Sequence, residues 1–131
     1  MAKPILCVDF DGVIHSYTSG WKGDDVIPDP PVEGALLWLL AALDHFNVQI
    51  YSSRSKTMGG RHAMQEWLRV WADKEFPKDD ADRLFKGVLF AWQKPAAFLT
   101  IDDRAITFKG DWQEFRLQPR QLLEFKPWNK S

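Results

Sequence analysis

The segment ILCVDFDGVIH, residues 5–15, decides the fold because a short apolar run ends there in two aspartates and a glycine. Its first four residues are apolar and rich in branched side chains, which is typical of a strand buried on both faces of a parallel sheet. Asp9 and Asp11 follow the apolar run at the strand's carboxyl end, where open parallel sheets bind their ligands. We therefore predict a central parallel strand over residues 4–9 that carries functional carboxylates at its end.

Composition limits the fold class and the cellular setting. The chain has 131 residues, of which 45% are hydrophobic and 14% aromatic, which suits one globular domain over residues 1–131. The 17 basic and 18 acidic residues nearly cancel, so the sequence lacks the basic excess of a non-specific nucleic-acid binder. Cys7, the single cysteine, is expected to be a core residue in a reducing compartment. No segment approaches the roughly 18 to 20 apolar residues of a membrane span, and a signal peptide is not apparent, so we expect a cytoplasmic protein without a membrane partner.

Helical and strand patterns alternate along the rest of the chain. The expected elements are, in order, a loop over residues 16–31, a helix over 32–46 with Glu33 in its first turn, a strand over 48–53, a helix over 60–76, a charged turn over 77–82, strands over 87–91 and 97–101, and a closing helix over 119–125. Such alternation implies right-handed crossovers and a parallel sheet. We therefore predict an α/β fold with three layers, Rossmann-like, with helices on both faces of the sheet. The tryptophans are expected to pack in the core, among them Trp38, Trp67, Trp71 and Trp112.

Polar side chains follow each expected strand. The strands end, in chain order, at Asp9 and Asp11, at Ser52 and Ser53, before Lys94, and at Asp102 and Asp103. Four carboxylates at one sheet edge are tolerated at neutral pH only with a cation among them or with some of them protonated. Oxygen ligands without clustered His or Cys favour Mg²⁺. The other residues include 14 acidic and 17 basic side chains, a balance that suits an anionic substrate.

Four segments of the chain resemble, in order, the four motifs of the haloacid dehalogenase (HAD) superfamily of phosphohydrolases. They are DFDGV at residues 9–13, Ser52 at a strand end, Lys94 with Pro95, and the pair Asp102 and Asp103. The resemblance covers the chain from residue 5 to about residue 104. Each motif alone is weak, but four in order at strand ends are specific. The segment TIDDRA also resembles the phosphatase domains of polynucleotide kinase-like proteins, a narrower likeness that depends on few residues.

The resemblance implies catalytic roles for four residues. Asp9 would attack phosphorus and become an aspartyl phosphate, while Asp11 would protonate the leaving oxygen and then activate water. Ser52 would donate a hydrogen bond to a phosphoryl oxygen, and Lys94 would neutralise charge on the nucleophile and the phosphate. The implied activity is that of a magnesium-dependent phosphatase acting on phosphate monoesters.

The same resemblance implies the binding groups. Mg²⁺ would be held by Asp9, the carbonyl of Asp11, and Asp103, with Asp102 either ligating the ion or orienting a metal-bound water. The backbone amide of Ser53 would assist Ser52 in binding the phosphoryl group. Gly12 and, from its position near the same rim, Arg54 are further candidates for binding substrate. Among the three histidines, only His15 is expected close enough to touch substrate.

Several residues keep two interpretations. Asp9 and Asp11 could form a calcium-like turn or a strand-end cap, and Lys94 could be a solvated surface lysine. A register shift of one residue would exchange the roles of Ser52 and Ser53. Arg54 and Arg104 could hold a substrate phosphate or make structural ion pairs. Tyr17 and Trp21 could stack on a nucleobase or pack their loop onto the sheet.

The intervals between the motifs hold only a loop and helices, so the resemblance implies an enzyme without a cap domain. Capless members act on large substrates or use a lid from a neighbouring subunit, which makes a homo-oligomer one expectation. The substrate expected here is a terminal phosphate on a nucleotide or nucleic-acid end. The alternative functions are a receiver-like phosphoacceptor domain, which the order of the acidic motifs disfavours, and a non-catalytic phosphate- and metal-binding module, which intact Asp9 and Asp11 disfavour.

Overall fold

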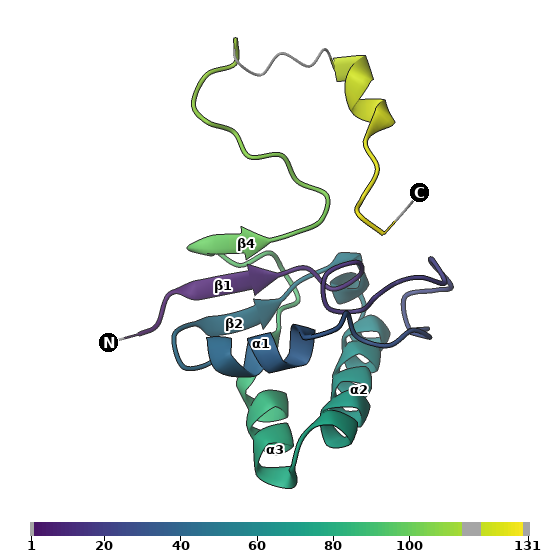
Figure 1. Cartoon of the computed structure of the whole chain (residues 1–131), viewed down its shortest axis with the longest axis vertical. Helices are drawn as coiled ribbons and strands as arrows, with labels where there is room; N and C mark the ends of the chain where they lie inside the picture. Colours follow the sequence, from purple (N-terminus) through teal and green to yellow (C-terminus); the bar gives the residue numbers. More distant parts are fainter. Residues whose placement is uncertain (1, 114–118, 130–131) are drawn as a thin grey trace.

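The computed structural model describes residues 2–113 and 119–129 and contains one parallel sheet. The strands are β1 (Ile5–Val8), β2 (Asn47–Ile50), β3 (Leu89–Phe90) and β4 (Leu99–Ile101). Their order across the sheet is β3-β2-β1-β4, so β1 lies between β2 and β4 (Figure 1). This confirms the predicted α/β class, the parallel sheet and the internal position of the first strand.

Three α-helices pack on one face of this sheet. The helices are α1 (Ala35–Ala42), α2 (Met58–Glu75) and α3 (Lys78–Gly87), with 3-10 helices η1 (Ser53–Lys56) and η2 (Pro119–Glu124). The crossovers from β1 to β2 and from β2 to β3 step in the same direction, so right-handed connections place their helices on the same face. None of the helices in the described ranges is long and apolar enough to cross a bilayer.

The predicted second helical layer is absent from the described residues. The return from β3 to β4 steps in the opposite direction and contains only the irregular segment 91–98, with no helix to cover the other face. The side chains of Leu89 and Thr100 are exposed there. The prediction of helices on both faces is therefore wrong for this part of the chain, because alternating apolar patterns do not reveal the direction of each crossover.

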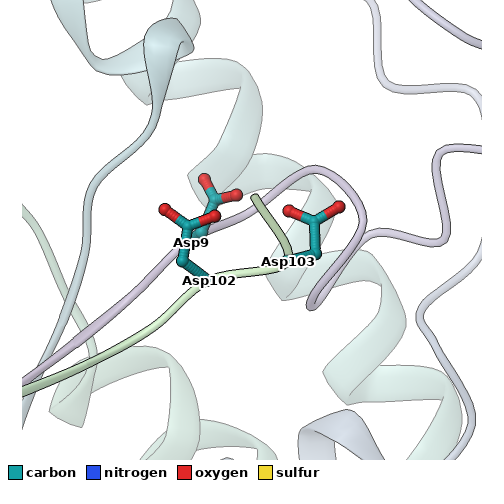
Figure 2. Close-up of side chains that lie close together, drawn as sticks. All are labelled: Asp9, Asp102 and Asp103. Atoms are coloured by element: carbon teal, nitrogen blue, oxygen red, sulfur yellow. The ribbon is translucent and has the colours of Figure 1, made fainter. Parts of the chain in front are cut away.

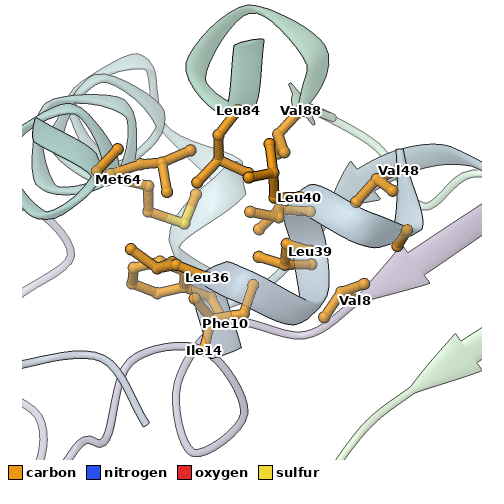
Figure 3. Packing of buried hydrophobic residues seen from close by; sticks show 14 of the residues in the cluster. Val8, Phe10, Ile14, Leu36, Leu39, Leu40, Val48, Met64, Leu84 and Val88 are labelled. Atoms are coloured by element: carbon orange, nitrogen blue, oxygen red, sulfur yellow. The ribbon is translucent and has the colours of Figure 1, made fainter. Parts of the chain in front are cut away.

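The core lies between the helices and the inner face of the sheet. Figure 3 shows Val8 from β1 and Val48 from β2 beside side chains of all three helices, including Leu36, Leu39, Leu40, Met64 and Leu84. The neighbouring strand residues Leu6 and Ile50 belong to the same buried cluster. Because this core joins β1 and β2 to the helices, it fixes the carboxyl ends of these strands, from which the candidate site is built.

Three predicted elements differ in detail from the structure. The helix expected over 32–46 is shorter, because Gly34 takes a left-handed backbone (φ 84°) at its N-cap, and Glu33 therefore lies before the helix. The charged turn expected over 77–82 is the first part of α3, in which Ala81 and Leu84 are buried at helical spacing. The closing element is a 3-10 helix rather than an α-helix.

The tryptophans divide between core and surface. Trp67 is buried and Trp71 packs against the core, as predicted. Trp38 is 51% exposed on the outer side of α1, and Trp112 is 74% exposed in the segment after β4. The prediction of core packing was therefore wrong for Trp38 and Trp112, since helical spacing alone does not tell which side of a helix is covered.

Candidate active site

Three aspartates meet at the carboxyl ends of β1 and β4. These strands are neighbours, with Val8 opposite Ile101, and the amide of Asp9 donates to the carbonyl of Ile101 at 2.9 Å. Asp9 therefore lies beside Asp102 and Asp103, which follow β4. Each residue offers one carboxylate oxygen, and these three oxygens lie within 4.8 Å of one another (Figure 2).

The electrostatics of this cluster fit a bound divalent cation. Burial raises the pKa of Asp9 to about 7, the amide of Phe10 opposes the shift by donating a hydrogen bond, and the charges of Asp102 and Asp103 add to it. The Oδ1 atom of Asp103 is buried and has no hydrogen-bond partner among the described residues. An all-oxygen donor set with an unsatisfied buried oxygen suits Mg²⁺. Asp9, Asp102 and Asp103 are thus the residues that could hold it.

Gly12 makes room for the cluster. Its backbone is left-handed (φ +82°), and a Cβ atom there would lie 3.0 Å from Cγ of Asp103 and closer still to Oδ2. Its amide donates to the carbonyl of His15 at 2.8 Å, and its carbonyl accepts a hydrogen bond from Nε1 of Trp128 at 2.7 Å. The structure thus shows a steric role for Gly12 beside Asp103, and the binding of substrate by Gly12 stays a prediction.

A pocket of about 340 Å³ opens beside the acidic cluster. It is lined by Asp9, Asp11, Tyr17, Ser52, Ser53, Asp102 and Arg104. The residues that follow β1, β2 and β4 therefore converge as the sequence predicts. The lining includes the guanidinium-bearing residue Arg104, which is exposed and able to approach an anion.

Tyr17 contributes strained backbone to the pocket wall. Its φ is 62°, a left-handed conformation that is rare for a residue with a side chain and that often occurs at functional sites. Burial, followed by the negative charge of Asp11, raises the pKa of the Tyr17 phenol above its usual value. Tyr17 thus lies in the electrostatic environment of Asp11, whereas Trp21 stacks on Arg54 with half of its surface exposed.

Ser52 lies where β2 ends and η1 begins. Its Oγ caps η1 by accepting the amide hydrogen of Arg54 at 3.0 Å, and it also contacts Sδ of Met64 at 3.7 Å. The thioether is a weak acceptor, so the hydroxyl hydrogen can turn toward a better acceptor in the pocket. Ser53 is exposed at the same rim. Of the two serines, Ser52 is the more rigidly held.

Asp11 faces the pocket but is held from behind by two buried side chains. Its carboxylate accepts hydrogen bonds from Nε of Arg54 at 2.9 and 3.1 Å and from Nδ1 of His15 at 2.9 Å. Arg54 has no exposed surface, and its Nη1 atom donates to the backbone carbonyls of Gly23, Asp24 and Val26. Of the two interpretations of Arg54, the structural ion pair is the one that the structure contains, and the binding of substrate by Arg54 stays a prediction.

Lys94 is not among the residues that line the pocket. It is exposed in the segment after β3, and it interacts electrostatically with the thiol of Cys7, two residues before Asp9. The carboxylates of Asp9 and Asp102 act on the same thiol, so Lys94 lies in the electrostatic neighbourhood of the acidic cluster without lining the pocket. Three of the four expected motifs therefore line one pocket, and the role of Lys94 at Asp9 stays a prediction.

Sequence reasoning missed two contributions to the site. His15 is fully buried against Asp11 and cannot touch substrate, contrary to expectation. Trp128 and Asn129 return to the loop after β1, where Asn129 donates to the carbonyl of Ser16 at 3.0 Å. The spacing of four between Asp11 and His15 was a usable signal for the first contact. No local pattern signals the second, because it joins residues at opposite ends of the sequence.

Comparisons with known proteins gave no match: no family model, no curated protein and no solved structure matches this chain. The site is therefore interpreted from its own geometry and from the motifs that form it. The relevant features are three clustered carboxylates, a pocket beside them, and a buried pair of side chains behind Asp11.

Proposed function

We propose that this chain is a magnesium-dependent phosphohydrolase that cleaves phosphate monoesters through an aspartyl phosphate on Asp9. The observation that carries the proposal is the group of carboxylate oxygens from Asp9, Asp102 and Asp103 beside a pocket that also contains Asp11. Asp9 is half-buried and belongs to this group, so its carboxylate could meet a phosphate that shares a bound cation. The resemblance to HAD phosphohydrolases supports the same assignment of Asp9.

The reaction divides into two balanced steps. In the first, an Asp9 oxygen bonds to phosphorus, the ester P–O bond breaks, and the leaving oxygen takes a proton from Asp11. In the second, water bonds to phosphorus, its proton returns to Asp11, and the bond from phosphorus to Asp9 breaks to release inorganic phosphate. Bound Mg²⁺ supplies charge neutralisation for the phosphoryl oxygens. Ser52 donates a hydrogen bond to one of these oxygens.

The proposed substrate is a terminal phosphate on a nucleotide or nucleic-acid end. Arg104 at the pocket rim supplies a cation for such an anion, and Trp21 presents an aromatic ring that is half exposed on the adjoining loop. Base stacking on an exposed ring contributes about 1 to 3 kcal/mol per base. No separate cap domain interrupts the described chain between Asp11 and β4, so a long substrate would have access to the pocket.

Magnesium is expected to control both activity and stability. Hydrolysis of an aryl phosphate should require added Mg²⁺ and cease with excess EDTA, and the melting temperature should rise with Mg²⁺ concentration because the ion binds only the folded cluster. Phosphate release and thermal unfolding measure the two effects. Equal rates with and without the ion, or no turnover of any phosphate ester, would contradict the proposal. A Mg²⁺-dependent rise in melting temperature without turnover would favour a binding module instead.

Substitution of Asp11 with Asn is expected to slow turnover by about 100-fold or more, since it removes the group that transfers protons in both steps. The amide oxygen can still accept from Arg54, but the loss of charge beside a buried guanidinium should also lower the melting temperature. The Mg²⁺-dependent rise in melting temperature should persist. Asp44→Asn, at an exposed ion pair with Arg83, is the control. Unchanged turnover in Asp11→Asn would refute the proton-transfer role.

A further inference from the structure

His15 is a fully buried histidine whose two ring nitrogens both have partners. The ring packs among the side chains of Phe10, Tyr17 and Trp67, with centroid distances of 5.6, 5.9 and 5.7 Å. Its Nε2 accepts a hydrogen bond from the amide of Asp29 at 3.1 Å. A backbone amide can only donate, so in the neutral ring the proton lies on Nδ1, which donates to Oδ1 of Asp11 at 2.9 Å.

The far side of His15 is held by Asp29. The carboxylate of Asp29 accepts hydrogen bonds from the amide and the hydroxyl of Ser19, at 2.7 and 2.6 Å. Its carbonyl accepts from Nε1 of the buried Trp67 at 2.9 Å. These contacts fix the backbone of Asp29 and with it the amide that bonds to His15. The ring is therefore held in one orientation from the side opposite Asp11.

Arg54 and His15 differ in how they contact Asp11. Arg54 shares one Nε hydrogen between both carboxylate oxygens, at 3.1 and 2.9 Å, so it anchors the carboxylate without strongly distinguishing the oxygens. His15 contacts Oδ1 alone. Within the described part of the chain, Oδ1 therefore has two donors and Oδ2 has one. Oδ2 therefore keeps the greater capacity to hydrogen-bond a group in the pocket.

We propose that His15 is a positioning residue for the proposed hydrolysis, which sets the rotation of the Asp11 carboxylate through the bond from Nδ1 to Oδ1 and leaves Oδ2 for the reacting oxygen. This inference rests on the proposed function. His15 is fully buried and does not contact substrate, so it would act only through Asp11. The hydrogen bonds from the backbone amide of Asp29 to His15 and from His15 to Asp11 also tie the loop after β1 to the pocket.

Two polar substitutions separate positioning from packing. His15→Asn places an amide nitrogen near the position of Nδ1, so it keeps a hydrogen-bond donor to Asp11. His15→Gln places its amide near the position of Nε2, so it keeps a hydrogen-bond partner for the backbone amide of Asp29 but loses the donor to Asp11. Both remove the ring from among Phe10, Tyr17 and Trp67, so both should lower the melting temperature similarly. The comparison is made with the full chain, well below both melting temperatures, with an aryl phosphate and Mg²⁺.

Wild-type turnover, and its loss in Asp9→Asn, are measured first. We then expect kcat to fall about 100-fold in His15→Gln, with KM little changed, because a misplaced proton-transfer group has an effect of this size. His15→Asn should recover most of that loss at a similar melting temperature. Equal losses in both variants, or losses that follow the melting temperatures, would show packing alone and overturn the inference. An inactive wild-type protein would instead overturn the proposed function, and the inference with it.

Discussion

Asp9→Asn is expected to abolish phosphoryl transfer and at the same time to stabilise the metal-free protein. The amide cannot form the aspartyl phosphate, so phosphate release should fall by about 10⁴-fold or more. The same change removes one of three carboxylates that lie close together. A neutral side chain of nearly equal volume relieves the repulsion from Asp102 and Asp103 and can donate a hydrogen bond to either of them.

The stabilising effect of Asp9→Asn should depend on pH in a defined direction. Burial raises the pKa of Asp9 from 3.8 to about 7, so between these values the folded protein retains a proton that the unfolded chain has lost. Unfolding then releases a proton, and the stability of the wild-type protein falls as the pH rises from about 4 to about 7. The gain in the variant should therefore be small near pH 4 and largest above pH 7.

Thermal unfolding in EDTA across this pH range measures that gain, and phosphate release with Mg²⁺ measures the loss of activity. Asp44→Asn serves as the control, because it makes the same chemical change at an exposed position. Turnover in Asp9→Asn would move the nucleophile to another residue. A lower melting temperature above pH 7 would contradict the repulsion that we infer within the cluster.

Gly12→Ala is expected to destabilise the protein and to weaken Mg²⁺ binding together. The left-handed backbone of Gly12 costs an alanine about 1 to 2 kcal/mol. The new methyl group would also overlap the carboxylate of Asp103. Asp103 must then move from its place beside Asp9, so the oxygen cluster loses its shape. Thermal unfolding and Mg²⁺ titration by calorimetry measure the two losses.

Gly34→Ala is the matched control for this substitution. Gly34 has nearly the same backbone angle, φ +84°, but its new Cβ would meet nothing within 4 Å. It should therefore show the backbone cost without any effect on Mg²⁺ binding. In an Asp103→Ala background, Gly12→Ala should cost no more than Gly34→Ala, because the clash is gone. Similar Mg²⁺ affinities in Gly12→Ala and the wild-type protein would contradict the proposed ligand role of Asp103.

The strands were predictable because a buried parallel strand has a simple signature, a short apolar run followed by polar residues. β1 and the ends of β2 and β4 were found in this way, and with them the convergence of Asp9, Asp102 and Asp103. The start of α3 was mistaken for a turn because its first residues are charged. The acidic residues after Pro77 in fact suit the first turn of a helix, where the helix dipole favours negative charge.

The buried supports of the site could not be predicted to the same degree. An arginine is seldom fully buried, and Arg54 is buried only because Asp11 and three loop carbonyls surround its guanidinium. Those carbonyls belong to a loop. Its turn residues can be recognised in the sequence, but the course of its backbone cannot be predicted from them. The position of Lys94 is hard to predict for a related reason, since the route of the segment after β3 depends on a crossover that carries no periodic pattern.

The strand order has a consequence for how the protein folds. β1 is the first of the four strands along the chain and β4 is the last, yet the two are neighbours in the sheet. Val8 of β1 lies opposite Ile101 of β4. Pairings between such distant segments form slowly, although their entropic cost grows only slowly with the length of the intervening chain. Asp9 lies on one side of that pairing, and Asp102 and Asp103 lie on the other. The proposed cation site cannot form before these two strands pair, so the gain of Mg²⁺ affinity that we expect during refolding would mark the completion of the sheet.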